Sequence, residues 1–456
     1  MTEKELLEMP SAIRFDHLAP SPVALGTADA PRSRIGSMAS ELQGSSILRI
    51  AGQVRALIAK GDPVVNLTVG DFNPAEFPAP APLVEFIREA LQSGETNYPP
   101  STGVPQLRVA VARFYADRLG LRFGDNGIVI AAGARPGIYS TFRVIVDPGD
   151  EVVFPVPSWN NVDYCHLVGA RPVMVPCDSS TDFLPTAGAL ARPLRSARLL
   201  VLNSPVNPTG AAFDADTLGS ICDLVLEENE RREAEGGRER PLFVLYDQVY
   251  WMLTFGDTRH VHPLGLRPEM APYTVYVDAI SKSFAATGIR VGWVAGPDDV
   301  IRGVSDVLGH SGAWAPRAEQ IATARLLADD DLIVRYHAEM LRDIRLRLDR
   351  LHYHLAAMRE AGLPVDVANP TATIYLSARF ALKGRRTPQG TVLRDDEAVR
   401  TYLLQQSGFA AVPFTAFGVN GDSGWFRLSV GAVSVPQIDA VMPRLHQAIA
   451  ATTPSE

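Results

Sequence analysis

Short apolar runs recur through the middle of the chain, and helical patterns separate most of them. The runs cover residues 128–132, 151–154, 172–175, 199–202, 242–246, 274–277 and 291–295. Strands that alternate with helices are typical of an α/β fold with a mainly parallel, doubly wound sheet. Such sheets bind ligands at the carboxyl ends of their strands. We therefore expect the functional residues among the polar side chains that follow these runs.

The rest of the chain predicts two domains and a leading arm. The 456 residues exceed one ordinary domain and suit two that share an interface. Residues 1–45 lack a strong period and are expected to form an N-terminal arm. We expect a large domain over 76–320 and a smaller α+β domain built from 46–75 and 321–456. The charge run 227–240 predicts a solvated helix end and loop without function.

Composition excludes several classes of function. The net charge of -8 gives no reason to expect a nucleic acid or an acidic membrane as partner. No run of eighteen apolar residues suggests a membrane span, and the N-terminus lacks the pattern of a signal peptide. The cysteines, Cys165, Cys177 and Cys222, lack metal-ligand spacing and are typical of free thiols in a reducing cytosol. We expect a cytoplasmic protein that binds no metal.

One lysine has an unusual setting. The chain has only four lysines, namely Lys4, Lys60, Lys282 and Lys383. Lys282 follows the apolar run 274–277 and is surrounded by Ala, Ile, Ser and Phe. A desolvated lysine has a lowered pKa and can serve as a Schiff-base amine. A partly buried structural lysine is the alternative.

Three further segments place polar groups at strand ends. Asp247 follows the apolar run 242–246, where a buried carboxylate is costly unless it is paired. A cationic ring nitrogen would be one such partner. A helix cap is the alternative role. Tyr250 follows three residues later. Asn207 lies in a Pro- and Gly-rich turn after the run 199–202, and can bond the backbone or a ligand oxygen. The small residues of 130–137 pass from strand into helix, where a phosphate can dock.

The combination of these motifs is more specific than any one of them. In chain order they are a small-residue turn at 130–137, Pro-Ser-Trp159, Asn-Pro-Thr-Gly210, Asp247-x-x-Tyr250, Ser-Lys282, Arg290 and Phe-Arg427-Leu-Ser. From about residue 66 to 430 the chain resembles the fold-type I, class I and II aminotransferases, the aspartate aminotransferase superfamily. The resemblance implies the PLP-transferase fold type I and the cofactor pyridoxal 5′-phosphate (PLP).

The resemblance also implies roles around the cofactor. Lys282 resembles the Schiff-base lysine that shuttles the proton, and Asp247 the carboxylate that pairs with the pyridinium nitrogen. Tyr250 and Asn207 resemble the groups that bond the ring oxygen, and Trp159 the aromatic residue that stacks on the ring. Phosphate contacts are implied for four further residues, namely the backbone N–H groups of Ala134 and Arg135, the side chain of Arg290, and Tyr98 reaching across to a second subunit.

Substrate contacts are implied as well. Gly70 resembles the glycine of a substrate loop, and Arg427 the arginine that grips the substrate α-carboxylate through its two-pronged guanidinium. Trp159 and Asn207 also face the substrate. The alternative for Arg427 is a structural salt bridge with one of the 51 acidic residues.

The implied activity is amino transfer between an L-amino acid and a 2-oxo acid, of the aspartate or broad-specificity type, by a homodimer with a biosynthetic role. Elimination, decarboxylation or aldol cleavage by the same lysine and aspartate is the alternative. A PLP-binding regulator would need a DNA-binding domain, for which the N-terminal arm is too short.

Overall fold

The computed structural model describes residues 34–42, 44 and 46–454. Residues 1–42 and 43–456 form two separate compact units. The described part of the first unit holds helix α2 (Ser37–Glu41), and most of the expected arm, residues 1–33, lies outside the described residues. The second unit contains both large sheets and all of the candidate site.

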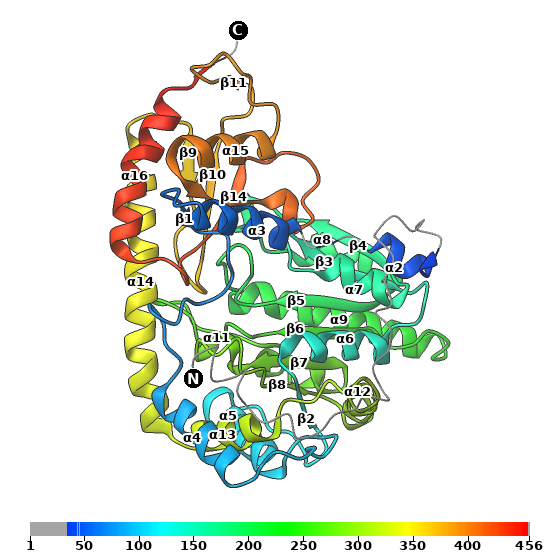
Figure 1. Ribbon diagram of the computed structural model, residues 1–456. Coiled ribbons are helices and arrows are strands. Elements are labelled where there is room, and N and C mark those ends of the chain that lie inside the picture. The colour runs from blue at the N-terminus through cyan, green and yellow to red at the C-terminus, as the bar shows by residue number, and fades with distance from the viewer. Residues whose placement is uncertain (1–33, 43, 45, 455–456) are drawn as a thin grey trace. The chain divides into compact units, whose positions relative to one another are not determined.

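A seven-stranded sheet forms the centre of this unit (Figure 1). Its strands are β2 (Ile128–Ala131), β3 (Glu151–Val156), β4 (Arg171–Pro176), β5 (Ala197–Asn203), β6 (Phe243–Asp247), β7 (Thr274–Ala279) and β8 (Gly292–Ala295). The order is β2-β8-β7-β6-β5-β3-β4, and β8 alone runs antiparallel to its neighbours. The expected α/β fold with a mainly parallel sheet is confirmed.

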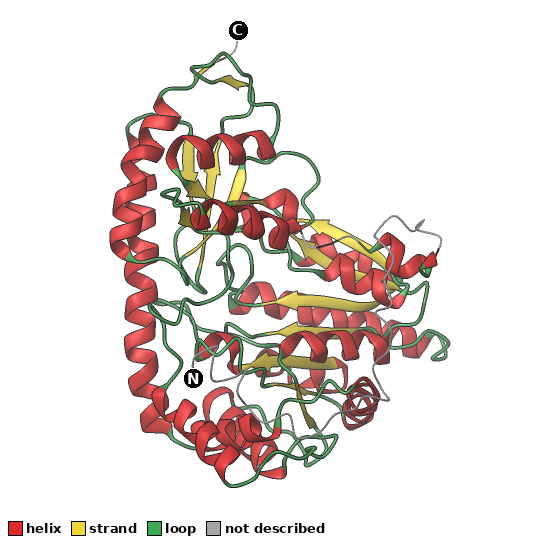
Figure 2. Ribbon diagram, in the orientation of Figure 1, coloured by secondary structure: helices red, strands yellow, loops and turns green. Residues whose placement is uncertain are grey.

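Helices cover both faces of this sheet, as Figure 2 shows in red around the yellow strands. One face packs against α4 (Ala81–Gln92), α5 (Pro105–Leu119), α9 (Ala215–Ala234) and α13 (Arg317–Leu327), and the other against α6 (Ala134–Ile145), α7 (Asn161–Val168) and α12 (Asp298–Ser311). Strand β5 shows the alternation that produces two cores: Leu200 and Leu202 join the first core, and Leu199 and Val201 join the second.

A second, antiparallel sheet of four short strands has the order β13-β14-β10-β9. Its strands are β9 (Val365–Val367), β10 (Tyr375–Phe380), β13 (Val412–Pro413) and β14 (Trp425–Ser429). Its core is shared with α14 (Asp330–Glu360), α15 (Asp396–Ser407) and α16 (Val435–Ala450). The division of the chain into a large and a small domain stays a prediction.

Shorter elements connect these two parts. The short strand β1 (Val65–Asn66) pairs in parallel with β12 (Phe409–Ala410). The remaining elements are α3 (Ser46–Ala59), α8 (Ala187–Ala191), α10 (Pro263–Leu266), α11 (Ile280–Ser283), β11 (Arg385–Arg386) and β15 (Thr453–Pro454), with several single turns of 3-10 helix.

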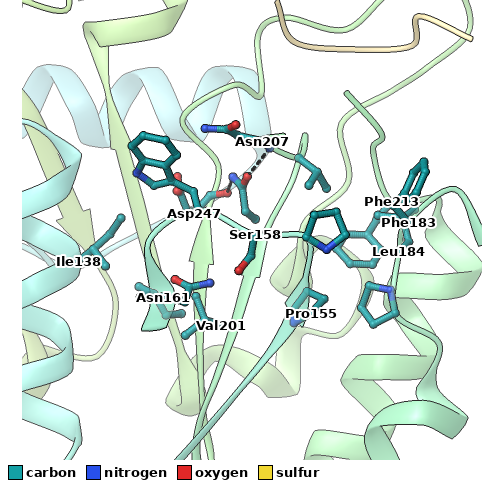
Figure 3. Close-up of a pocket in the computed structure, with 16 residues that line it drawn as sticks. Ile138, Pro155, Ser158, Asn161, Phe183, Leu184, Val201, Asn207, Phe213 and Asp247 are labelled. Atoms are coloured by element: carbon teal, nitrogen blue, oxygen red, sulfur yellow. Dashed lines mark hydrogen bonds between the residues drawn. The ribbon is translucent and has the colours of Figure 1, made fainter. Parts of the chain in front are cut away.

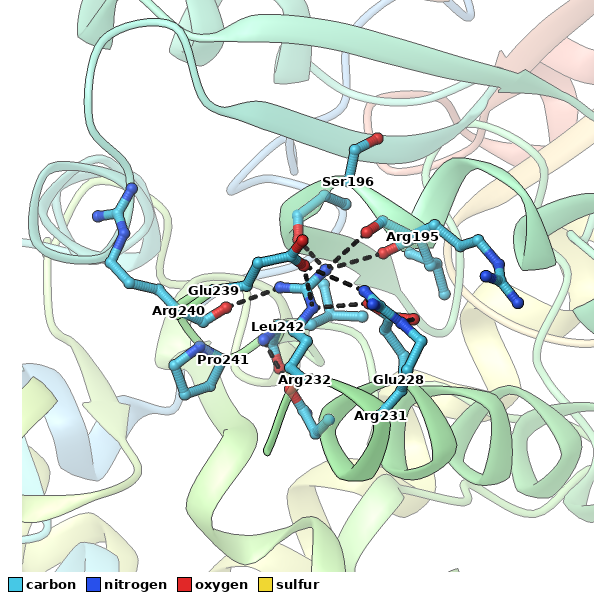
Figure 4. A network of polar contacts seen from close by, with 12 residues as sticks. Arg195, Ser196, Glu228, Arg231, Arg232, Glu239, Arg240, Pro241 and Leu242 are labelled. Carbon is cyan, nitrogen blue, oxygen red and sulfur yellow. Dashed lines mark hydrogen bonds and ion pairs between the residues drawn. The ribbon is translucent and has the colours of Figure 1, made fainter. Parts of the chain in front are cut away.

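The charge run 227–240 corrects one expectation. It is not wholly solvated, because Glu228, Asn229 and Arg232 on α9 are buried. The guanidinium of Arg232 donates from Nε to Glu228 (2.7 Å) and from its two Nη atoms to four backbone carbonyls (Figure 4). The carbonyls belong to Leu194, Arg195, Ala197 and Arg240, near the amino ends of β5 and β6. Composition alone could not show that these loops need a cation.

Candidate active site

A cavity of about 450 Å³ opens at the carboxyl ends of β5, β6 and β7. Nine of the residues predicted from the sequence line it: Gly70, Ala134, Arg135, Trp159, Asn207, Asp247, Tyr250, Lys282 and Arg290. These residues come from seven separate segments of the chain. The carboxyl ends of neighbouring parallel strands lie at one edge of the sheet, and this brings the predicted residues together.

Lys282 lies on the single-turn helix α11 directly after β7. Its Nζ donates a hydrogen bond to the carbonyl oxygen of Gly70 at 2.6 Å. Burial lowers the pKa of the Lys282 amine to about 8; the charge of Asp71 opposes this shift, and three nearby arginines add to it. Roughly a tenth of the amine is thus unprotonated at pH 7, far more than for an ordinary lysine, and the unprotonated amine is the form that a nucleophile or general base requires.

Asp247 is the last residue of β6. Its Oδ1 accepts a hydrogen bond from the backbone N–H of Val249 at 3.1 Å, at the start of a turn rather than of the helix that the alternative role as a helix cap would require. Burial raises the pKa of the Asp247 carboxyl to about 6, against the effects of that hydrogen bond and of the Lys282 charge. No arginine or lysine forms an ion pair with it among the described residues. A cationic ligand group would relieve the cost of its charge.

An anion cradle lies at the start of α6. Gly133 precedes this helix, and a side chain there would collide with the Arg290 guanidinium. Arg290 takes up a left-handed backbone conformation (φ 62°) and donates to the carbonyls of Thr287 (2.7 Å) and Ala132 (2.9 Å). The free N–H groups of the helix N-terminus and this arginine together suit a phosphate.

Arg427 reaches the site from β14 of the smaller sheet and is fully buried. It donates to the Asn207 Oδ1 (3.0 Å) and to the Thr68 carbonyl (2.6 Å), while its Nε has no hydrogen-bond partner. No acidic residue of the described chain forms an ion pair with Arg427, so the alternative of a structural salt bridge finds no support among those residues. Burial lowers the pKa of this guanidinium, as expected for an unpaired cation.

Aromatic side chains border the cavity. The Arg135 guanidinium lies 5.0 Å from the centre of the Trp159 ring. A smaller, largely apolar pocket shares Trp159 with the cavity. Phe183, Phe213 and the polar pair Asn207 and Asp247 also line it (Figure 3). Tyr98 does not line the cavity: its side chain is 82% exposed and packs edge-on against Trp314, with ring centres 5.5 Å apart.

Sequence reasoning missed several lining residues. Tyr375 is the first residue of β10, and its Oη would lie 2.5 Å from any Cβ at Gly70. Asp71 accepts a hydrogen bond from Thr287 Oγ1 at 2.6 Å, and Arg55 extends from α3. Asp71 adjoins the predicted Gly70 in the sequence and could have been found from it. No sequence pattern indicates the direction of the Tyr375 side chain.

Known proteins resemble this chain over most of its length. The family model for aminotransferase class I and II matches residues 62–445. The chain belongs to the class I and II aminotransferases. The aspartate aminotransferase of Rhizobium meliloti (strain 1021) is 29% identical over 421 residues, which cover 92% of this chain and 96% of that protein. A bifunctional aspartate aminotransferase and glutamate/aspartate-prephenate aminotransferase of Petunia hybrida is 29% identical over 417 residues, covering 90% and 81%.

Solved structures agree with this family. The crystal structure of the aspartate aminotransferase from Rhizobium meliloti has a TM-score of 0.82 and 27% identity, covering 92% of this chain and 99% of that one. The aspartate aminotransferase from Thermotoga maritima has a TM-score of 0.77 and 26% identity, covering 91% and 99%. This aminotransferase is thus a PLP-dependent transaminase of fold type I.

The residues present fit that cofactor. The cradle at α6 suits its phosphate, the unpaired Asp247 its ring nitrogen, and Lys282 its aldehyde carbon. None of the described helices is long and apolar enough to cross a membrane. The described residues also contain no group of three or more His, Cys, Asp or Glu side chains that could hold a metal ion.

Proposed function

We propose that Lys282, Asp247 and Arg427 form the working centre of this transaminase. The observation that carries the proposal is Arg427, a fully buried cation with no carboxylate partner in the described chain, close enough to Lys282 to lower its pKa. A buried guanidinium of this kind needs an anion. The α-carboxylate of an amino acid is such an anion, and its α-carbon would then face the lysine.

PLP, when bound, supplies an electron sink for the negative charge that develops at the substrate α-carbon. Lys282 takes the α-proton at Nζ and returns it on the cofactor side, because its pKa of about 8 permits both protonation states near neutral pH. Asp247, ionised above about pH 6, holds the proton of the ring nitrogen. Asn207 and Tyr250 would donate to the ring oxygen of the bound cofactor, and Trp159 would stack on its ring.

The phosphate is held by the backbone N–H groups of Ala134 and Arg135 and by the Arg290 side chain. Gly70 leaves space for the substrate, because a Cβ there would meet the Tyr375 hydroxyl. Tyr98 is well exposed and reaches the phosphate of a partner subunit, so the working unit is a homodimer. We place this enzyme in the cytoplasm, in a biosynthetic role.

The preferred substrates are amino acids with an acidic side chain, together with their 2-oxo acids. Arg55 and Arg135 both line the cavity, and neither forms an ion pair within the described part of the chain. These two guanidinium groups can bind the side-chain carboxylate of the substrate. The aspartate aminotransferases among the relatives support this preference.

The test is a half-reaction screen. The holoenzyme is mixed with single amino acids, and the loss of the visible absorption band of the cofactor is followed. We expect aspartate and glutamate to react faster than alanine and phenylalanine, and Arg135→Met to reduce the advantage of the acids by about tenfold, ~1.4 kcal/mol. The proposal fails if no amino acid changes the band, or if carbon dioxide or free ammonia is released, because in amino transfer the amino group stays on the cofactor.

A further inference from the structure

Two buried phenols meet beside the cavity. The hydroxyl oxygens of Tyr250 and Tyr375 are 2.7 Å apart, and their rings lie edge-on with centres 5.6 Å apart. Tyr250 follows β6 of the large sheet and Tyr375 begins β10 of the small one, and both side chains are almost wholly buried. Each phenol has a single proton, so the pair has one proton between the two oxygens and one free to serve a third group.

Arg427 decides which phenol is the better donor. Its guanidinium lies 4.7 Å from the centre of the Tyr375 ring. Burial raises the pKa of both phenols, and the charge of Arg427 lowers both, more prominently for Tyr375. The contact between the two oxygens allows either of them to donate. With the Arg427 cation over its ring, Tyr375 is the more acidic phenol and the stronger donor, so the shared proton is assigned to Tyr375. The proton of Tyr250 is then free for the cavity.

The backbone fixes the direction of Tyr375. Thr373 lies two residues earlier in a left-handed conformation (φ 65°), which is a strained state for a β-branched residue. The Thr373 hydroxyl accepts a hydrogen bond from the backbone N–H of Tyr375 at 2.9 Å. The backbone N–H of Thr373 donates to the carbonyl oxygen of Leu253 at 2.7 Å. On the other side, a Cβ at Gly210 would lie 2.6 Å from the Tyr375 carbonyl oxygen. Such close contacts leave the phenol little freedom.

We propose that Tyr375 is a positioning residue of this transaminase: it donates to Tyr250, and thereby fixes the Tyr250 hydroxyl for donation to the ring oxygen of the cofactor. Consecutive hydrogen bonds polarise one another, so the Tyr375 donation also strengthens the bond that Tyr250 makes. Because Arg427 stacks on Tyr375, the chain of contacts joins the carboxylate-binding arginine to the cofactor ring. This inference rests on the role proposed for Tyr250.

The experiment is a pH titration of the visible band of the bound cofactor in four holoenzymes: the parent, Tyr375→Phe, Tyr250→Phe and the double variant. A donor to the ring oxygen stabilises the negative charge that remains there when the linked nitrogen loses its proton. Its loss therefore raises the midpoint pH. We expect Tyr375→Phe to raise the midpoint by about 0.3 to 1 unit, the scale of one hydrogen bond, and Tyr250→Phe to raise it more.

The double variant is the decisive member. If Tyr375 acts through Tyr250, the double variant has the midpoint of Tyr250→Phe alone. Additive shifts, or an unchanged midpoint in Tyr375→Phe, would overturn the inference. Tyr246→Phe is the matched control, since it also removes a buried hydroxyl, one that donates to the Val261 carbonyl at 2.7 Å; it should lower the melting temperature and leave the midpoint unchanged. A parent protein without a visible band would contradict the proposed function instead.

Discussion

Arg427 and Arg232 are both buried arginines, and they lie near opposite ends of the strands of the seven-stranded sheet. Arg232, near the amino ends of the strands, has a carboxylate partner and four carbonyl acceptors. Arg427, near the carboxyl ends, has an amide and one carbonyl, with its Nε unpaired. The same side chain is thus fully compensated in one region and left partly uncompensated in the other.

The carboxylates of the two regions differ in the same way. For Glu228, burial raises the pKa but the hydrogen bonds from Arg231 and Arg232 outweigh it, and the pKa is lowered. For Asp247, burial dominates and the pKa rises to about 6. Charges near the amino ends stabilise the fold, whereas charges near the carboxyl ends are held at a cost that a bound ligand relieves.

The largest expected effect is on stability, through Arg232. Replacing Arg232 with Met leaves four carbonyls and Glu228 without their shared donor, and should lower the free energy of unfolding by about 3–5 kcal/mol. Activity per folded molecule should not change, because the residue is far from the cavity. Chemical denaturation measures the loss. As a control, Arg113→Ala breaks an exposed pair with Asp117 on α5 and should cost less than about 1 kcal/mol; equal losses would refute the comparison.

Arg427 should show the reverse pattern. Arg427→Lys keeps the charge but loses the two-pronged geometry. We expect kcat/KM to fall by two or more orders of magnitude, roughly 3 kcal/mol, while the cofactor stays bound and the melting temperature changes little. Amines without a carboxylate should be affected much less. Loss of PLP, or a reaction with amino acids as fast as that of the parent, would show that this arginine has another role.

A smaller effect is expected from Asp247→Asn in the protein stripped of PLP. The pKa of Asp247 rises from 3.8 to about 6 on folding, so ionisation of this carboxyl costs stability. The cost grows as the pH rises from about 4 to 6 and is complete above that. Asn removes it, and the apoprotein should gain up to about 3 kcal/mol at pH 7 but only about 0.5 kcal/mol at pH 4.

The variant should lose transaminase activity although it is more stable, which thermal denaturation and rate measurements on the same samples can establish. Glu228→Gln is the matched change near the amino ends and should destabilise the protein, since this carboxylate is paired with two arginines. A loss of stability in both variants would remove the distinction between the two regions.

Sequence patterns predict the region around Arg232 less well than the cavity around Arg427. The residues of the cavity belong to short motifs whose order carries the resemblance to a known family, and that resemblance implies a shared site for the nine residues that line it. Arg232 belongs to a charge run that is typical of a solvated helix end, and only the loops that fold back on α9 show that it is buried. Tyr375 was missed for a similar reason, because the strained backbone at Thr373 that aims it is not visible in a sequence.

The central claim is that Lys282 holds the cofactor within a cationic cavity. Borohydride reduction of the purified holoenzyme, followed by digestion and mass spectrometry, tests it directly, because the chain has only three other lysines, Lys4, Lys60 and Lys383. We expect a yellow protein that loses its visible band on reduction, with the phosphopyridoxyl group on the Lys282 peptide alone. A label on another lysine, or no label on any, would contradict it.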